Sequence, residues 1–515
     1  MSLKRCGEIS MERKSRVANT GKDPKKLVII GAGIAGLSAG IYARRNGYDT
    51  TIYEQHYLPG GLCTAWQRGG FTFEGCMHYI GLVGSSPAHV YYDQWKELGV
   101  SPATVVIHHD LFHTFQDKSG RTLNLYTDID RSEAELLSLS PSDAVEIKAL
   151  CMAVKRYACF IQRTGKNPFH LLTKYAGILR AIPLLKKYGS LTLGQYAARF
   201  NDPLIRHALT YLFVDPDFAS TTLFFFLAGM HLTGAAFPQG SSLSLARTVA
   251  HTFIDLGGRI EYQHKVTHIE INKGRATGIE LQDGQVEEAD IIISAADGHA
   301  TLFGLLGDNY TTPELRERFA TQSLYPSFIQ VSLGVNRDLS GTPHAVKAQT
   351  AEPFEIAGQT RQELWYQHFA FDPTLAPRGK TPVTVLYPSD LDWWENLGYG
   401  TEAYQAEKQK ILETTVAQLD KFLPGISSQI VVEDVSTPFT IQRYTNNWHA
   451  APGFMLTTDL AADMVMHPQY ALPGLDGFYM IGQWVKGFGT PMAAASGREA
   501  IQKVCGKDRK KFRAV

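Results

Sequence analysis

Short apolar runs alternate with glycine-rich and polar stretches along the first sixty residues of the chain. Residues 27–30 (LVII) form an apolar, largely β-branched run that predicts a buried parallel strand. A helical stretch follows the glycines of residues 31–36 and ends near Asn46 and Gly47, residue types that commonly terminate helices. A second strand is predicted over residues 49–53 and finishes at Glu54. The pattern therefore predicts strand, glycine-rich turn, helix and strand in succession.

Two later parts of the chain also carry regular patterns. Residues 243–256 predict a helix that ends at a glycine pair, and residues 259–263 predict the strand after it. Residues 266–271 and 276–281 alternate like a hairpin closed at a lysine and a glycine. Near the C-terminus, residues 478–481 predict a short strand, followed by a glycine-rich loop and a helix from about Met492.

The glycines of residues 31–36 (GAGIAG) suit a dinucleotide. Gly31 permits a tight turn, Gly33 lets the backbone approach a pyrophosphate, and Gly36 lets the helix pack against the strand. The N–H groups and dipole of the helix N-terminus then favour the phosphates. Glu54 lies 18 residues after Gly36, at the end of the second strand, where a carboxylate binds ribose hydroxyl groups. The predicted ligand is an adenine dinucleotide, FAD or NAD.

The residues after Glu54 favour FAD over NAD. Gly60 and Gly61, in the segment PGGLCT, place two more glycines where a second group of backbone N–H donors can reach the pyrophosphate. The C-terminal Gly487 and Gly489 do not form a second dinucleotide motif, because no acidic residue follows them at the required distance. The sequence therefore predicts one dinucleotide and no NAD(P)H domain.

Four segments resemble the phytoene desaturase, carotenoid isomerase and retinol saturase superfamily of FAD-dependent oxidoreductases. They are residues 28–66, 238–297, 437–456 and 474–500. The resemblance covers the flavin-binding half of the chain in the right order, and residues 105–235 and 305–430 have no recognisable counterpart. One departure is Gln483, where the superfamily usually has an acid that contacts the ribityl hydroxyls; an amide also donates and accepts hydrogen bonds.

The resemblance implies an α/β fold: a Rossmann-type FAD-binding domain with a noncontiguous α+β substrate domain, as in flavin amine oxidases and phytoene desaturases. The expected FAD-binding domain consists of residues 25–104, 236–304 and 431–515, the substrate domain of residues 105–235 and 305–430, and residues 1–24 form a mobile tail. The motifs and the resemblance together predict as cofactor-binding residues Gly31, Gly33, Ala35, Gly36, Glu54, Gln55, Gly60, Gly61, Leu62, His78, Tyr79, Val266, Gly482, Gln483, Pro491 and Met492.

Composition excludes several other classes of protein. Fifty basic residues balance fifty acidic residues, which argues against a nucleic-acid-binding protein. The six cysteines are scattered and form no C-x-x-C motif, so no disulfide scaffold and no metal site are expected. The longest stretch without charged residues, 218–246, is interrupted by polar residues and lacks the roughly 20 mainly apolar residues of a spanning helix. These features predict a cytoplasmic protein.

Two stretches of the substrate domain suit an apolar substrate. Residues 169–188 combine many apolar side chains with four basic and no acidic residues, a composition that suits either a peripheral membrane contact or a helix packed on its own lobe with a solvated basic edge. Pro183 interrupts this stretch. Residues 223–230 (LFFFLAGM) are typical of a core helix or of the wall of a hydrocarbon tunnel.

His78 is the candidate catalytic residue, because the resemblance places its segment beside the flavin ring and an imidazole can protonate or orient a reacting group. A hydrogen-bonded core histidine is the alternative interpretation. Trp66 and Tyr79 are expected to shape the pocket, and Arg443 and Tyr444 are expected on a returning strand.

The predicted function is an FAD-dependent oxidoreductase that desaturates, saturates or isomerises an apolar polyene, with a quinone or oxygen as the electron acceptor where one is needed. A flavin amine oxidase-like enzyme acting on a more polar substrate and a non-enzymatic lipid-binding escort remain as alternatives.

Overall fold

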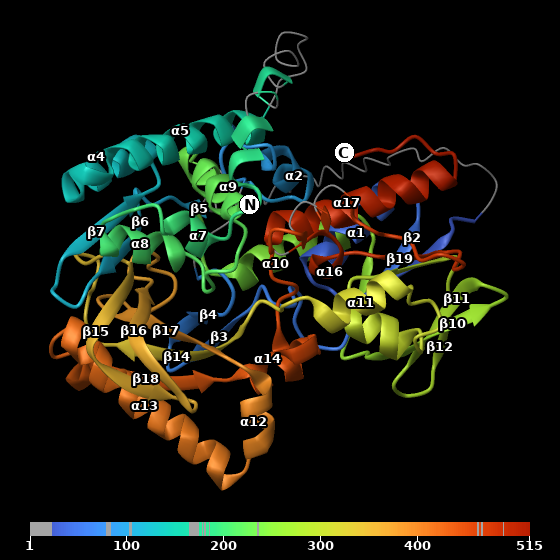
Figure 1. Ribbon diagram of the computed structural model, residues 1–515. Coiled ribbons are helices and arrows are strands. Elements are labelled where there is room, and N and C mark those ends of the chain that lie inside the picture. The colour runs from blue at the N-terminus through green and yellow to red at the C-terminus, as the bar shows by residue number, and fades with distance from the viewer. Residues whose placement is uncertain are drawn as a thin grey trace, which may run out of the picture.

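The computed structural model describes residues 23–78, 84–101, 106–163, 175–177, 179, 182–184, 186–233, 236–460, 463–464, 467–487 and 489–515. Two lobes are built around two large sheets (Figure 1), and the chain passes between them several times. The fold is of the α/β class, with a Rossmann-type domain and a noncontiguous second domain.

A five-stranded parallel sheet forms the centre of the first lobe, which we call the parallel-sheet lobe. Its strands, in spatial order, are β19 (Phe478–Met480), β13 (Ile291–Ser294), β1 (Lys26–Ile30), β2 (Asp49–Glu54) and β9 (Arg259–Tyr262). Three distant parts of the sequence therefore contribute to one sheet. The apolar run predicted at residues 27–30 is buried at the centre, as expected of a parallel strand covered on both faces.

Helices pack against this sheet and against one another. The longest are α1 (Ile34–Arg45), α10 (Ser242–Asp255) and α17 (Thr490–Lys507). Small residues allow close packing between α1 and α17: a Cβ atom on Gly497 would lie 2.5 Å from the carbonyl oxygen of Ala35. Beside the sheet lies an antiparallel sheet of β10 (Val266–Asn272), β11 (Arg275–Leu281) and β12 (Val286–Glu288).

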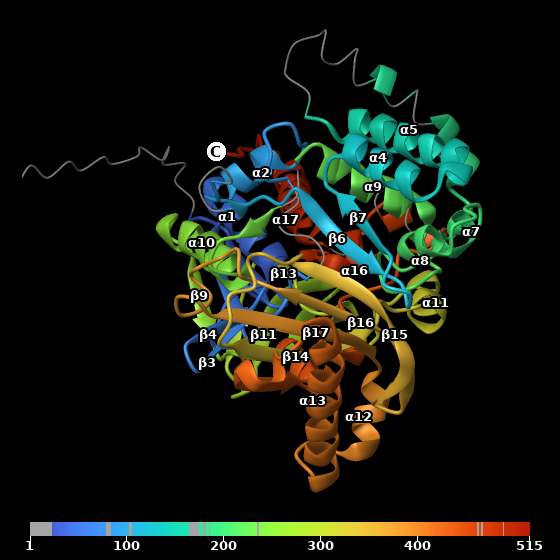
Figure 2. The same ribbon diagram turned by 90° about the vertical axis from the view of Figure 1, so that its left-hand side faces the viewer.

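A seven-stranded sheet dominates the second lobe, which we call the antiparallel-sheet lobe. Its order is β18 (Ile430–Ser436), β14 (Ser327–Val335), β17 (Thr381–Ser389), β16 (Gln359–His368), β15 (Ala345–Ile356), β6 (Leu111–Gln116) and β7 (Thr122–Tyr126), with β15 and β6 the parallel pair. Strand β18 pairs with β14 here although it lies in the range predicted for the FAD-binding domain. Helices α12 (Leu391–Leu397) and α13 (Glu402–Phe422) lie on the outer side of the sheet in Figure 2.

A group of helices completes the second lobe above the sheet (Figure 1). They are α4 (Ile129–Leu139), α5 (Ala144–Ile161), α7 (Leu193–Ala197), α8 (Pro203–Thr210) and α9 (Ser220–His231). The apolar segment 223–230 lies within α9, and its rings pack into a cluster of buried aliphatic and aromatic side chains.

The remaining helices and strands are short. They are β3 (Ala65–Arg68), β4 (Phe71–Glu74), α2 (Tyr92–Glu97), β5 (Val106–Ile107), η1 (Pro141–Asp143), β8 (Phe237–Pro238), η2 (Ala300–Leu305), α11 (Pro313–Thr321), η3 (Ser427–Gln429), α14 (Pro438–Thr445), η4 (Trp448–Ala450) and α16 (Gln483–Lys486). The prediction of a strand at Arg443 and Tyr444 is wrong, because both residues lie in α14. Pro438 at the first position of α14 and the capping box of Thr437 with Thr440 favour a helix start there.

Candidate functional site

A long cavity opens at the carboxyl ends of β1, β2, β13 and β19. It encloses about 1350 Å³, part of it open to solvent, and its walls come from the start of the chain, from residues around 264–305 and from the last 75 residues. Ligands of open parallel sheets bind at this edge. The cavity is therefore the candidate functional site.

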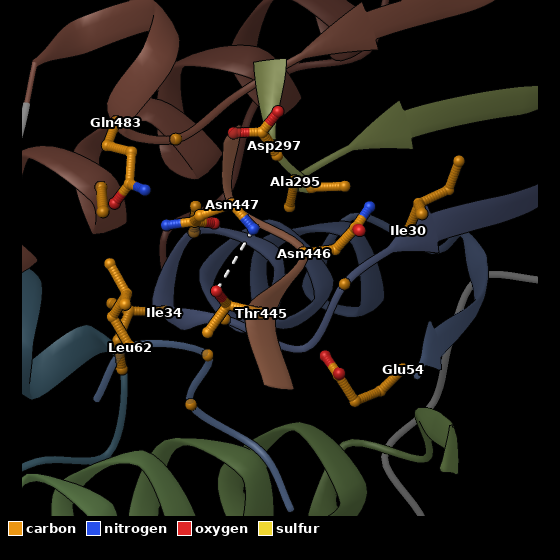
Figure 3. A pocket seen from close by; sticks show the side chains of 18 of the residues that line it. Ile30, Ile34, Glu54, Leu62, Ala295, Asp297, Thr445, Asn446, Asn447 and Gln483 are labelled. Atoms are coloured by element: carbon orange, nitrogen blue, oxygen red, sulfur yellow. Dashed lines mark hydrogen bonds between the residues drawn. The ribbon is translucent and has the colours of Figure 1, made fainter. Parts of the chain in front are cut away.

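Most of the predicted cofactor-binding residues line this cavity. They are Gly31, Gly33, Ala35, Glu54, Gln55, Gly60, Gly61, Leu62, Val266, Gly482 and Gln483. Their side chains come from segments far apart in the sequence, and Figure 3 shows Glu54 at one end of the site with Leu62 and Gln483 at the other.

The other predicted residues have different positions. Gly36 packs within the turn, where a Cβ atom would lie 2.0 Å from the carbonyl oxygen of Gly31. Pro491 and Met492 face α2: the carbonyl of Pro491 accepts a hydrogen bond from Gln94, and the sulfur of Met492 accepts one from Tyr91. Tyr79 lies outside the described residues, and His78 is considered below.

The two glycine segments pack against each other. The N–H of Gly60 donates to the carbonyl of Ala32 (2.8 Å), and a Cβ atom on Gly61 would lie 3.4 Å from the Cα of Gly33. A Cβ atom on Gly33 itself would meet no described atom within 4 Å. Because Gly33 lines the cavity and no described atom occupies the space beside it, a ligand can approach its backbone closely.

Glu54 is buried at the end of β2. Its carboxylate accepts hydrogen bonds from the backbone N–H groups of Ala32 (2.6 Å) and His56 (2.9 Å). Burial raises the pKa of Glu54, and these backbone hydrogen bonds oppose the rise. A carboxylate has about four acceptor positions, so acceptor capacity remains for the hydroxyl groups of a ribose.

Two helix N-termini face the cavity. Helix α1 begins after Gly33 and α17 after Gly489, and no described side chain caps either of them by a hydrogen bond. Gly489 and Thr490 line the cavity wall. Uncapped N–H groups and the helix dipole favour negative charge, so the site can bind a diphosphate at α1 and stabilise negative charge at α17.

Several cavity residues were not predicted. Asp297 lies three residues after the end of β13, and its carboxylate accepts hydrogen bonds from the N–H groups of Ala300 (2.8 Å) and Trp448 (3.1 Å). Burial raises the pKa of Asp297 to about 6. Asn446, in the left-handed conformation after α14, and Asn447 enter the cavity beside it (Figure 3). The acidic residue shortly after the apolar run of residues 291–293 was the available signal.

His78 lies between the two lobes, outside the residues that line the cavity. It is partly buried, and its Nδ1 lies 3.3 Å from Nε2 of Gln367 on β16. Burial lowers the pKa of His78 to about 4. The imidazole is therefore neutral near pH 7 and can donate or accept a hydrogen bond, but it holds no second proton to give.

Two further findings concern other kinds of site. No group of three or more metal-binding side chains occurs among the described residues. Within the same part of the chain, no helix combines the length and the apolar character needed to cross a membrane.

The arrangement fits FAD. The open space at Gly33, the anion-binding start of α1 and the carboxylate of Glu54 suit the pyrophosphate and the adenosine ribose. Gln483 and the start of α17 form the opposite end of the cavity, where the ribityl chain and the ring would lie.

Comparisons with known proteins agree with this interpretation. A family model described as flavin containing amine oxidoreductase matches residues 34–505. The chain is 25% identical over 504 residues to a neurosporene-forming phytoene desaturase from Rhodobacter capsulatus, covering 93% of this chain and 94% of that one. It is 25% identical over 462 residues to a chloroplastic prolycopene isomerase from Daucus carota, covering 81% of this chain and 70% of that one.

Solved structures with a similar fold include amine oxidases. A triple mutant of putrescine oxidase superposes with a TM-score of 0.63 at 14% identity, covering 94% of this chain and 99% of that chain. Cyclohexylamine oxidase from Brevibacterium oxydans gives a TM-score of 0.59 at 14% identity, covering 95% of this chain and all of that chain. At such low identity these similarities concern the fold alone.

Proposed function

The chain belongs to the flavin containing amine oxidoreductase family, and we propose that this FAD-dependent oxidoreductase desaturates, saturates or isomerises double bonds of an apolar, carotenoid-like polyene. The observation that carries the proposal is the extent of the similarity to carotenoid enzymes. It covers 93% of the chain for the desaturase, and so includes most of the antiparallel-sheet lobe, which would select the substrate.

The interior of the antiparallel-sheet lobe supports an apolar substrate. The ring of Phe226 on α9 lies 5.1 Å from that of Phe213 and 5.5 Å from that of Phe112, between centroids. Phe225 and Phe226 are only partly buried, so the helix still presents aromatic surface. Aromatic and aliphatic surface of this kind favours a hydrocarbon over a charged amine.

Bound FAD supplies hydride transfer to or from a substrate carbon. The chain's own residues would have three roles toward it: Gly33 and α1 would hold the diphosphate, Glu54 would hold the ribose, and the start of α17 would stabilise negative charge at the ring end. His78, which lies within hydrogen-bond distance of Gln367 of the antiparallel-sheet lobe, is the candidate residue for orienting the reacting part of the substrate. Because His78 is neutral, it would act by hydrogen bonding or by weak basicity.

The electron partner is proposed from the single dinucleotide motif. The sequence carries one such motif and no second motif of this kind for a nicotinamide nucleotide, so net oxidation would pass electrons to a quinone or to oxygen. Isomerisation would need a reduced flavin and no external acceptor.

A peripheral membrane contact is proposed at α5 and the segment after it. Large apolar side chains are exposed there, with exposed fractions of 51% for Met152, 61% for Tyr175 and 66% for Leu179. Lys186 and Lys187 supply positive charge on the same segment, whereas Lys174 and Arg180 lie outside the described residues. Pro183 lies in a helical stretch, residues 182–184. An enzyme acting on a polyene gains access to it by docking on the bilayer in which it dissolves.

Product analysis distinguishes the three proposed reactions. The holoprotein is incubated anaerobically with an acyclic polyene in liposomes, once with oxidised and once with chemically reduced flavin, and the polyene is analysed by chromatography and absorption spectroscopy. Loss of hydrogen with oxidised flavin indicates desaturation, gain of hydrogen with reduced flavin indicates saturation, and a geometric change without gain or loss indicates isomerisation. An unchanged polyene under both conditions, with other acyclic polyenes also unchanged, would contradict the proposal.

A further inference from the structure

Two cysteines face each other at the end of the β3–β4 hairpin. The hairpin pairs Ala65 with Glu74, and the N–H of Gly75 donates to the carbonyl of Thr64 (3.0 Å), which extends the pairing by one residue. Cys63 and Cys76 lie one step beyond this pair, in the bends that flank the two strands. Their Sγ atoms lie 3.7 Å apart, and both cysteines are free.

This register suits a disulfide. Residues directly opposite in an antiparallel pair have Cα atoms about 4.5 to 5.5 Å apart, within the range of about 4.4 to 6.8 Å that disulfides span. The two Sγ atoms already face each other, and bond formation requires them to approach from 3.7 Å to about 2.05 Å.

The pair also lies in the wall of the cofactor cavity. Cys63 and Cys76 both line it, together with Leu62 and Gln483. In Figure 3, Leu62 and Gln483 lie at the end of the cavity opposite Glu54. Because Glu54 marks the ribose end, the cysteine that follows Leu62 lies toward the end that would hold the flavin ring.

We propose that Cys63 and Cys76 form a redox-active pair that exchanges two electrons with the bound FAD. Oxidation of the two thiols forms one S–S bond and releases two electrons and two protons, which convert oxidised FAD into its two-electron reduced form. The reverse reaction breaks the S–S bond and returns the electrons to the thiols. The pair would thus store two further electrons beside the flavin, independently of the substrate.

The surroundings favour the protonated dithiol in the reduced state. The Cys63 thiol and burial, together with the Glu74 carboxylate, raise the pKa of Cys76 well above its ordinary value. Glu74 is itself held in place, because its carboxylate accepts hydrogen bonds from the N–H groups of Ser242 (2.7 Å) and Cys76 (2.9 Å). The other described cysteines do not line the cavity.

Anaerobic photoreduction of the holoprotein tests this proposal, because the electrons then enter through the flavin. The protein is first oxidised in air, and thiols are alkylated under denaturing conditions at each stage and located by peptide mass spectrometry. We expect Cys63 and Cys76 to be linked at the start and alkylated at the end, with about four electrons taken up per FAD, two for each two-electron couple.

Three variants complete the test. Cys63→Ser and Cys76→Ser should each take up about two electrons per FAD, and Cys159→Ser, an exposed cysteine outside the cavity, should behave as the wild type. Uptake of two electrons by the wild type would overturn the proposal. So would full alkylation of both cysteines in the air-oxidised protein, a result that needs no variant to fold.

Discussion

At the scale of single residues, Gly33 and Gly36 differ in what limits them. A Cβ atom on Gly33 has no described atom within 4 Å, whereas one on Gly36 would lie 2.0 Å from a carbonyl oxygen. Gly33 also has an ordinary φ of −66°. Gly33 therefore has to be a glycine for ligand binding, and Gly36 for the packing of the turn.

The prediction for Gly33 follows from this difference. Gly33→Val should leave the apoprotein folded, because the added methyl groups enter the cavity, but it should weaken FAD binding by roughly 100-fold or more, because they occupy the space of the pyrophosphate. Flavin content and thermal unfolding of the apoprotein measure the two effects. Gly36→Ala is the matched control and should lower the stability. A Gly33→Val protein with full flavin content would refute this assignment.

The role of His78 can be tested through pH. Because its pKa is about 4, kcat should show no inflection from this residue between about pH 5.5 and 8. His78→Phe should lower kcat by roughly 100-fold, within the usual range for lost acid–base assistance, with the flavin content unchanged. Gln367→Leu should have a smaller effect in the same direction. A step near pH 6.5 in the wild type that disappears in His78→Phe would show that the imidazolium acts as an acid.

The sequence predicted those site residues whose role is local. The glycines and Glu54 belong to one strand, turn, helix and strand unit, so their spacing determines their relative positions. Gln367 is separated from His78 by 289 residues, and only the packing of two lobes brings them together. The Cys63–Cys76 pair required the hairpin register, which the sequence did not predict.

At the scale of elements, the predicted strands and helices of the parallel-sheet lobe are present. The helix predicted over residues 243–256 is found over Ser242–Asp255, and the strand predicted over 259–263 over Arg259–Tyr262. The segment around Arg443 became α14 because Pro438 and the capping box start a helix. In the antiparallel-sheet lobe, β14 pairs with β17 and β18, and β15 with β6, from distant segments, so the sheet order could not be predicted from the pattern.

The proposed membrane contact is an element-scale prediction. Leu179→Glu with Ile182→Glu should reduce flotation with anionic liposomes, because both side chains are exposed beside basic residues. Lys186→Glu with Lys187→Glu should also reduce flotation, because each lysine contributes about 1 kcal/mol to the free energy of binding an anionic surface. The reversal of charge adds to the loss, which should be largest at low salt. Val286→Glu with Val431→Glu, at equally exposed positions elsewhere, is the control. If all variants float as the wild type does, the segment makes no membrane contact, and the alternative of a helix packed on its own lobe holds.

At the scale of the whole molecule, buried histidines should make the protein sensitive to acid. Burial lowers the pKa of six histidines to about 4 or less: His78, His89, His109, His113, His344 and His368. These groups bind protons near pH 6.5 only when the chain unfolds. Burial of Glu54, Glu74 and Asp297 raises their pKa values and acts in the opposite direction.

The balance favours loss of stability in acid. Below about pH 6.5 the unfolded chain gains up to six protons on the histidines, and the native protein gains up to three on the carboxyl groups. Each net proton lowers the free energy of unfolding by about 1.4 kcal/mol per pH unit. The urea midpoint should therefore fall as the pH decreases from about 6.5 to 4. A midpoint that stays constant or rises over this range would contradict the burial of these histidines.

The most direct measurement of the whole account is the anaerobic visible spectrum of the purified holoprotein during addition of candidate substrates. We expect about one releasable FAD per chain. We also expect an acyclic polyene in liposomes to bleach or shift the flavin absorption, whereas putrescine and cyclohexylamine should leave it unchanged. A colourless protein that takes up no FAD, or a flavin that is bleached by an amine and unaffected by every polyene, would contradict the proposed function.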